Sequence, residues 1–321
     1  MKEYDDESLH KLQQIELMIL RDSLEICKRH NIQMFGIAGT AIGAIRHHGF
    51  IPWDDDIDVA FLRKDYDKFV HYIKLEMSDK YTVMCTATDP DYFLMSTKIM
   101  LNGSKFREID AKDIDCFFGI FLDVFVLDNL PNDEHLLKKQ CKQSFIYSKL
   151  MILRSVAFPV LPYKGIKAKL THFATAIIHG VLVLFHISKE KLGKQCLKIA
   201  TRYNSENNVK SVGYLFDTKT DIDTFALDDL FPLRAVKFEG IDFFLPKNIE
   251  KNLKLVYGNF MQLPPVEKRK NHYPYELNFG KFDEYSTADI ASGKYDFQFS
   301  NECSNISDYT ESKQRNNEDV K

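Results

Sequence analysis

The stretch GTAIGAIRHHGFIPWDDDID, residues 39–58, ends in four aspartates: Asp54, Asp55, Asp56 and Asp58. The next residues, Val59–Leu62, are apolar, which indicates a buried strand with carboxylates at its beginning. Side chains alternate along a strand, so Asp56 and Asp58 point the same way and Asp55 points the other way. Two carboxylates on one face repel each other by about a kcal/mol or more at intermediate dielectric. A divalent cation would remove this repulsion, and Mg²⁺ or Mn²⁺ suits such hard oxygen ligands.

Two other interpretations of the acidic stretch have to be weighed. A solvated acidic turn is the simplest alternative, whereas an EF-hand loop is excluded because Val59 occupies the sixth position counted from Asp54, where that loop needs glycine. The residues upstream favour an enzymatic site. Met34–Ala38 is a short apolar strand, and Gly39-Thr40 then opens a helix whose backbone N–H groups and hydroxyl can bind an anion.

These residues carry a family resemblance. Gly39-Thr40 together with AIRHHGFIPWDDDID, residues 44–58, resembles the signature of the LicD-family phosphotransferases, which belong with the fukutin-type transferases to the nucleotidyltransferase-fold superfamily. Similarity continues through Asp65-Tyr66 and Phe69, through 119–128 and through 231–257. The resemblance implies an α/β fold: a nucleotidyltransferase-like small mixed sheet covered by helices, with a helical insertion. It also implies a third acid on a neighbouring strand that faces the first two.

Asp123 fits that third position. It is embedded in the apolar run Phe117–Asp128, which predicts a central strand, and an isolated buried carboxylate is costly without a partner. Asp128 ends this run before a turn, so we interpret it as structural. By resemblance, Asp56 and Asp58 hold the metal on the donor pyrophosphate, and Asp123 completes a second metal site or accepts a proton from the acceptor hydroxyl.

Several further residues are candidate substrate ligands. By resemblance, Gly39 and Thr40 grip phosphate, and Arg46, alternatively a cation at a helix C-terminus, neutralises a substrate phosphate. Lys98 lies within the apolar stretch Phe93–Leu101, so it is expected to face an acid or a phosphate. Trp53 is predicted to anchor its loop in the core, with stacking on a ligand base as the alternative.

The composition bounds the class of protein. The chain has 321 residues, is 45% hydrophobic and 28% charged, and carries a net charge of −3, which fits a globular protein and gives no argument for a nucleic-acid partner. Six widely spaced cysteines without a C-x-x-C pair suggest neither a zinc module nor a disulfide framework. The first residues, MKEYDDESLHK, lack an apolar signal core. A cytoplasmic location follows as the expectation, with the inner face of the membrane as an alternative.

The chain divides into four predicted parts: residues 1–135 form the catalytic core, 136–210 a helical insertion, 211–300 the C-terminal part of the catalytic unit, and 301–321 a disordered tail. Within the insertion, Thr171–Ile187 is largely apolar, but it is short for a bilayer span and contains histidines. We predict a buried helix here. Peripheral membrane contact is the alternative, since Lys164, Lys167 and Lys169 are close.

Other predicted elements are more local. They are helices at Glu7–His30, Lys64–Leu75 and Asn248–Tyr257, a strand at Tyr81–Thr86, a helix capped at Asn132 or Asp133, and a hairpin of Pro232–Lys237 and Ile241–Leu245 turning at Glu239-Gly240.

The resemblance also supplies an expected reaction. It is the transfer of a phospho-alcohol such as phosphocholine from a CDP-activated alcohol donor such as CDP-choline to a hydroxyl of a glycan or lipid-linked oligosaccharide, with release of CMP. Acceptors of this kind include teichoic acid, lipopolysaccharide and other cell-surface polysaccharides. The alternatives are a nucleotidyltransferase acting on a small molecule, a glycosyltransferase with an Asp-x-Asp motif, and an inactive relative that serves as a scaffold.

Overall fold

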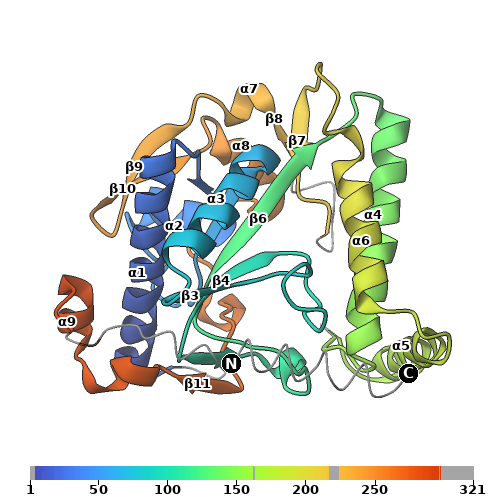
Figure 1. The fold of residues 1–321 in the computed structure, drawn as a ribbon, viewed down its shortest axis with the longest axis horizontal. Coiled ribbons are helices and arrows are strands. Elements are labelled where there is room, and N and C mark those ends of the chain that lie inside the picture. The colour runs from blue at the N-terminus through green and yellow to red at the C-terminus, as the bar shows by residue number, and fades with distance from the viewer. Residues whose placement is uncertain (1–3, 162, 217–223, 296, 298–321) are drawn as a thin grey trace.

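A mixed β-sheet carries the acidic segment through the middle of the molecule (Figure 1). The computed structural model describes residues 4–161, 163–216, 224–295 and 297, so the predicted tail at 301–321 lies outside the described residues. The path of the sheet is β1 (Phe35–Gly36), β2 (Asp58–Leu62), β6 (Phe121–Asn129), β4 (Thr97–Leu101) and β3 (Tyr81–Met84), and the far end of β6 also pairs with β7 (Ser211–Gly213), which pairs with β8 (Thr224–Ala226). Strands β2 and β6 run parallel, whereas the other pairs are antiparallel. The predicted α/β class with a mixed sheet is confirmed.

Helix α1 (Asp6–His30) is the first cover of the sheet. The Asp5 carboxylate caps its N-terminus by accepting from the Ser8 N–H at 2.8 Å, and Asn31, in the left-handed conformation, ends it directly after His30, the predicted last residue. Its apolar stripe, which includes Leu12, Ile15 and Ile19, is fully buried. Helix α3 (Arg63–Glu76) contacts α1, and both helices contact β6.

The segment that carries the aspartates is held from two sides. Helix α2 (Ala38–Arg46) precedes it, and the hairpin of β9 (Arg234–Phe238) and β10 (Ile241–Leu245) clamps the loop after α2. The Glu239 carboxylate accepts from the Phe50 N–H at 3.0 Å, and a Cβ atom on Gly49 would lie 1.9 Å from Glu239 Oε1. Glycine at position 49 therefore allows this close approach.

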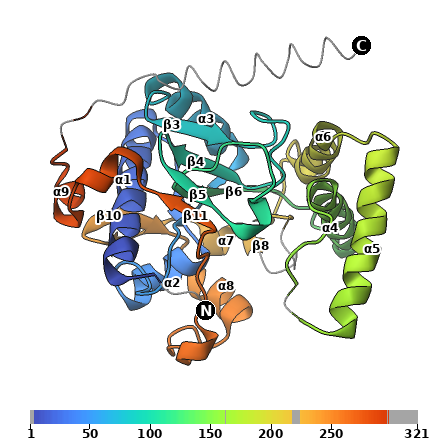
Figure 2. The same cartoon turned by 90° about the horizontal axis from the view of Figure 1, so that it is seen from below.

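The C-terminal part of the described chain completes the covering of the sheet (Figure 2). Its elements are α7 (Leu227–Leu230), α8 (Ile249–Tyr257), β11 (Glu276–Asn278), which pairs with β5 (Lys105–Arg107), and α9 (Thr287–Ser292), which contacts α1. The predicted hairpin and the predicted helix at Asn248–Tyr257 are thus confirmed.

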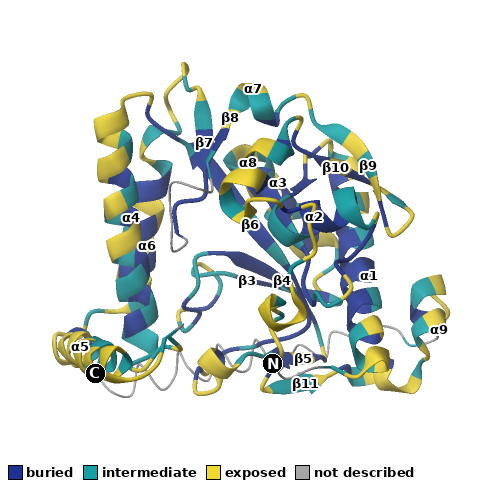
Figure 3. Cartoon of the chain, turned by 180° about the vertical axis from the view of Figure 1, so that it is seen from behind, coloured by how far each residue is buried: buried dark blue, intermediate teal, exposed yellow. Residues whose placement is uncertain are grey.

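Three helices stand to one side of the sheet. Helices α4 (Glu134–Ser155) and α6 (Lys189–Ala200) pack side by side, and α5 (Ile166–Leu184) forms the outer edge of this group (Figures 1 and 2). The Asp133 side chain caps α4, accepting from the Leu136 N–H at 2.8 Å. In Figure 3 α5 is largely coloured as exposed, while the sheet is coloured as buried.

The prediction of a buried helix at Thr171–Ile187 is wrong. Of the residues of α5, only Leu182 is buried, because the helix contacts the rest of the protein along one narrow stripe. Within the described part of the chain, α5 is the one helix whose length and apolar composition would be sufficient to cross a membrane.

Candidate active site

Asp56, Asp58 and Asp123 come together at the N-terminal ends of β2 and β6. The parallel register pairs Asp58 with Asp123, and the Asp123 N–H donates to the Ile57 carbonyl at 3.0 Å. One carboxylate oxygen from each of the three residues lies within 4.8 Å of the others. The three acids that the sequence singled out therefore form one cluster.

Burial and mutual repulsion raise the proton affinity of this cluster. Burial raises the pKa of Asp56 to about 6, and the charge on His272 opposes this shift. Burial, with the charges of Asp56 and Asp123, raises the pKa of Asp58 well above its usual range. The nearby positive charge is therefore too small to offset the burial and mutual repulsion of these carboxylates.

The donor set fits a divalent metal. It offers hard carboxylate oxygens at the short mutual distance that a single ion can bridge. Asp123 Oδ1 is buried and has no hydrogen-bond partner among the described residues, so an acceptor is free within the cluster. These residues fit Mg²⁺ or Mn²⁺.

Lys98 faces an acid of the cluster. Its Nζ lies 2.8 Å from Asp123 Oδ2 and 3.1 Å from the centroid of the Phe121 ring, and only 4% of the residue is exposed. The two strands that carry Lys98 and Asp123 pair in register, which sets these side chains opposite each other. The cost of burying the lysine is thus offset by a carboxylate and by an aromatic face.

The beginning of α2 lies against the same acids. Thr40 Oγ1 accepts from the Asp58 N–H at 2.7 Å, and a Cβ atom on Gly39 would lie 2.9 Å from Asp54 Oδ2. Because residue 39 is glycine, the first turn of the helix can approach the carboxylates this closely. The predicted phosphate-binding turn and the predicted metal site are therefore adjacent in space.

Arg46 lies at the other end of α2. Its Nε donates to His47 Nε2 at 2.9 Å, and its Nη1 donates to the Phe260 carbonyl. Burial lowers its pKa, and the charge of Asp54 opposes this shift. Trp53 packs against the core as predicted, with the Arg269 guanidinium 4.2 Å from its ring centroid. Arg46 therefore neighbours the acidic loop without contacting the cluster of Asp56, Asp58 and Asp123.

Asp128 has the structural role that the sequence predicted. Arg63 donates two hydrogen bonds to its carboxylate, at 2.8 and 2.7 Å, and Asn204 Nδ2 donates a third at 2.6 Å. This ion pair joins the far end of β6 to the start of α3.

Sequence reasoning missed His272, which reaches the site from the C-terminal part of the chain. Its backbone N–H donates to both oxygens of Asp55, at 2.8 and 3.0 Å, and its Nδ1 lies 3.3 Å from Asp56 Oδ2. The His272 ring also interacts with Asp55, with Nδ1 3.5 Å from Asp55 Oδ1, and this side-chain interaction raises the pKa of His272 to about 10, which favours the cationic ring at neutral pH. Tyr4 OH also donates to Asp55, at 2.7 Å. No local sequence signal connects these distant residues.

Glu16 is a second residue that the sequence analysis did not single out. It is fully buried on α1, and neither of its carboxylate oxygens has a hydrogen-bond partner among the described residues. Burial, with the charges of Asp56, Asp55 and Asp54, raises its pKa well above the usual range. An acid spaced four residues after Leu12 on the apolar stripe of the helix was the signal that could have identified it.

A cavity of about 360 Å³ opens from the cluster toward α4. Asp56, Asp123, Lys98 and His272 lie on its polar side, and Ser148, Lys149 and Ile152 line it from α4. Aromatic side chains form much of the remaining wall: Phe93, Phe121, Phe125, Tyr214 and Phe216. The Phe125 and Tyr214 rings meet edge to face at 5.0 Å, and Glu108 adds a carboxylate. This cavity can accept a ligand with both phosphate and apolar parts.

Comparison with known proteins defines the family. Residues 31–158 match the family model described as LicD/FKTN/FKRP, nucleotidyltransferase domain. The chain is 31% identical over 273 residues, 83% of its length and 96% of the other, to the lipopolysaccharide cholinephosphotransferase LicD of Haemophilus influenzae. It is also 38% identical over 47 residues to uncharacterized proteins of Rickettsia prowazekii and Rickettsia typhi, which covers 15% of this chain and 18% and 15% of theirs. This chain belongs to the LicD family of phosphotransferases.

Proposed function

We propose that this protein transfers phosphocholine, or a similar phospho-alcohol, from a CDP-activated donor to a hydroxyl of a glycan or lipid-linked oligosaccharide and releases CMP. The observation that carries the proposal is the cluster of Asp56, Asp58 and Asp123 at the opening of an aromatic cavity. The activity named for the Haemophilus influenzae relative, lipopolysaccharide cholinephosphotransfer, supports the choice of transferred group and acceptor.

In this proposal Asp56, Asp58 and Asp123 hold Mg²⁺ or Mn²⁺. When bound, such an ion neutralises negative charge on the donor diphosphate and on the departing phosphate. Lys98 keeps the Asp123 carboxylate in place through the 2.8 Å contact and adds positive charge to the same side of the cavity. His272 supplies a further cation beside Asp56.

The first turn of α2 would bind the donor phosphates. Gly39 exposes the backbone of the helix N-terminus to the acids, and Thr40 is fixed by the Asp58 N–H. Arg46 would contribute its charge from the Asp54 side of the loop. Together with Lys98 and His272, the N–H groups of this turn would stabilise the charge that builds up as CMP leaves.

The aromatic wall would bind the alcohol part of the donor. Aromatic faces attract quaternary ammonium groups, and a nearby carboxylate strengthens this attraction. Phe125, Tyr214 and Phe216 supply the faces, and Glu108 supplies the carboxylate. A trimethylammonium group fits this wall better than a neutral polyol does.

Transfer requires the acceptor hydroxyl to lose its proton. The acceptor oxygen forms a bond to the phosphorus atom, the bond from phosphorus to the CMP oxygen breaks, and the proton passes to a carboxylate of the cluster. Asp123 Oδ1, which has no hydrogen-bond partner among the described residues, would accept this proton in the alternative in which Asp56 and Asp58 alone hold the ion.

The test is a screen of CDP-alcohols for CMP release with Mg²⁺, Mn²⁺ or a chelator, each with and without candidate glycans. We expect metal-dependent CMP release with CDP-choline that increases when lipopolysaccharide or teichoic acid is supplied. Release of pyrophosphate from a nucleoside triphosphate would instead support a nucleotidyltransferase, the activity class in the description of the matching family model. Turnover by Asp56→Asn and Asp58→Asn at the wild-type rate would contradict the proposal.

A further inference from the structure

A helix on a protein surface usually turns its apolar side toward the protein and its polar side toward solvent, whereas α5 does the opposite. Its polar side chains face the protein: His172 Nε2 donates to the Pro159 carbonyl at 3.0 Å, Thr175 Oγ1 to Ala157 at 2.9 Å, and His179 Nδ1 to Leu153 at 2.8 Å. The buried Leu182 continues this stripe at helical spacing. The helix is thus attached along its length to the end of α4 and the loop that follows it.

The opposite side of α5 is apolar and exposed. Phe173 is 68% exposed and Leu170 64%. The other large exposed apolar residues are Ile166, Ile177, Ile178, Val181, Val183 and Leu184 on α5, Phe185 directly after it, and Phe158 and Val160 in the segment before it. We call these eleven residues the outer face. A soluble protein seldom exposes an apolar surface this continuous without a partner, so we expect the outer face to contact an apolar partner.

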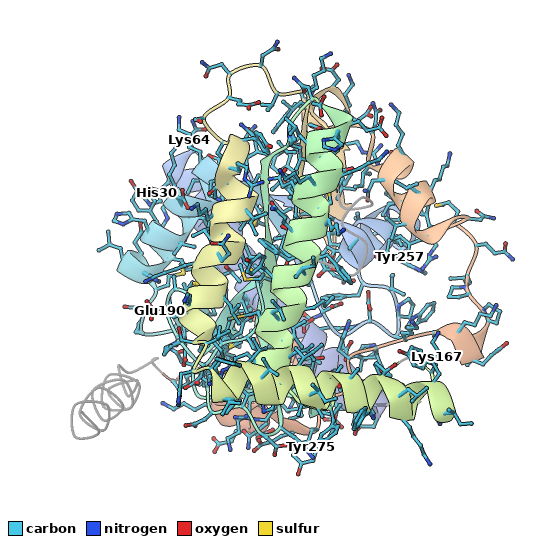
Figure 4. All side chains as sticks on the ribbon, turned by 90° about the vertical axis from the view of Figure 1, so that its right-hand side faces the viewer. His30, Lys64, Lys167, Glu190, Tyr257 and Tyr275 are labelled. Atoms are coloured by element: carbon cyan, nitrogen blue, oxygen red, sulfur yellow. The ribbon has the colours of Figure 1, made fainter. Side chains whose placement is uncertain are left out.

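Charge selects the kind of partner. From His135 to Lys189 the sequence contains no aspartate or glutamate but has nine lysines and arginines, in a protein whose net charge is −3. Lys164, Lys167 and Lys169 are exposed around the start of α5, close in sequence to the exposed Ile166 and Leu170. Lys167 is labelled on this end of the helix in Figure 4. Basic residues at the rim of an apolar face match the anionic headgroups and acyl chains of a lipid surface.

The outer face is also joined to the candidate active site. Ile152 lines the active-site cavity from α4, and an adjoining cavity of about 150 Å³ is lined by Ile152, Val156 and Pro159. Pro159 is the residue whose carbonyl accepts from His172. The chain that forms one wall of the site therefore continues directly into α5.

We propose that α5 docks the protein on an anionic lipid bilayer, lying in the plane of the surface with the outer face in the lipid. A span across the bilayer would require His172, Thr175 and His179 to leave their backbone partners. The surface orientation keeps these contacts and brings the site to the membrane. This inference does not depend on which phospho-alcohol is transferred.

The test is co-sedimentation of the full-length protein with phosphatidylcholine vesicles, either pure or containing one third phosphatidylglycerol. We expect binding that requires the anionic lipid and weakens with salt. The variant Phe173→Glu/Ile177→Glu should bind at least about tenfold more weakly, because it places charge in the lipid. Lys164→Glu/Lys167→Glu/Lys169→Glu should lose about a hundredfold, since each surface lysine contributes about 1 kcal/mol.

Leu75→Glu is the matched control, because Leu75 is 67% exposed on α3, outside the outer face. It should bind vesicles like the wild type, and all variants should keep the wild-type melting temperature. Failure of the wild type to bind anionic vesicles would overturn the proposal, as would unchanged binding by Phe173→Glu/Ile177→Glu. A dimer that this variant dissociates, without vesicle binding, would assign the outer face to a second copy instead. Protein that stays in the vesicles after alkaline carbonate extraction would indicate a span, which also contradicts surface docking.

Discussion

Asp58 and Asp123 lie directly opposite each other in the parallel pair of β2 and β6. Residues that are paired in a parallel register point to the same face of the sheet, so two carboxylates 65 positions apart in the sequence meet at one end of the sheet. Asp56 joins them from the chain just before β2. Each of the following predictions depends on this meeting of charges or on the cavity beside it.

Replacement of any single acid of the cluster should abolish turnover. For Asp56→Asn, Asp58→Asn and Asp123→Asn we expect a loss of at least about a hundredfold in metal-dependent CMP release, because charge stabilisation in such sites supplies several kcal/mol. The melting temperature of metal-free Asp56→Asn and Asp58→Asn should not fall, since each change removes a repelling charge, whereas Asp123→Asn should lower it because the buried Lys98 loses its carboxylate partner.

Asp128→Asn is the matched control for these variants, because it lies on the same strand as Asp123. Breaking its buried pair with Arg63 should cost about 3–5 kcal/mol of stability. The protein that remains folded should still release CMP in a metal-dependent reaction. Full activity in any of the three cluster variants would exclude that acid from the metal site.

The stability of the metal-free protein should fall as the pH rises. The pKa of Asp56 is raised from 3.8 to about 6, and that of His272 from 6.5 to about 10. For each group, the folded state therefore binds more protons than the unfolded state at pH values between the lower and the higher pKa of that group. Stability is therefore lost as pH rises through each folded value. Thermal melts in chelator from about pH 5 to about pH 9 should show this decline.

Added Mg²⁺ or Mn²⁺ should reverse that decline. The metal replaces the protons that the carboxylates lose, so it should raise the melting temperature more at about pH 8 than at about pH 5. Asp56→Asn should flatten the lower part of the pH profile, and His272→Gln should flatten the upper part. A metal effect equal at both pH values would contradict the assignment.

Glu16→Gln should stabilise the protein at alkaline pH. Burial raises the pKa of Glu16 well above its usual value of 4.5, so the folded protein keeps this proton to higher pH than the unfolded chain does and loses stability as the pH rises above about 4.5. Glutamine does not ionise, so Glu16→Gln removes this pH-dependent loss of stability. The melting temperature should rise at about pH 8 and change little at about pH 5. Glu25→Gln, at an exposed position of the same helix, should have no such effect. A lower melting temperature for Glu16→Gln at pH 8 would show that the ionised carboxylate is required.

Loss of an aromatic face should weaken binding of a cationic alcohol. Phe125→Leu keeps most of the apolar volume but removes the ring that meets Tyr214. We expect the KM for CDP-choline to rise about fivefold, because cation–π contacts contribute about 1 kcal/mol. The KM for a CDP-linked neutral polyol, if turned over, should change little. Equal effects on both donors would place the alcohol elsewhere.

Local patterns were sufficient where burial and alternation act on neighbouring residues. The apolar run after Asp58 and the isolated acid within Phe117–Asp128 predicted two strands and their carboxylates, because an acid in an apolar strand has to lie at an end or find a partner. The same reasoning failed for α5. An apolar sequence indicates contact with an apolar phase, but it does not distinguish the protein interior from an external partner.

The sequence by itself determined the α/β class, the strands that carry Asp58 and Asp123, and the glycine-threonine turn before them, since each depends on residues close together in the chain. Only the tertiary structure decided that Lys98 faces Asp123, that His272 closes over Asp55 from 217 positions away, and that the polar stripe of α5 faces inward. These contacts join segments whose mutual positions depend on the path of the whole chain, and no local periodicity encodes that path.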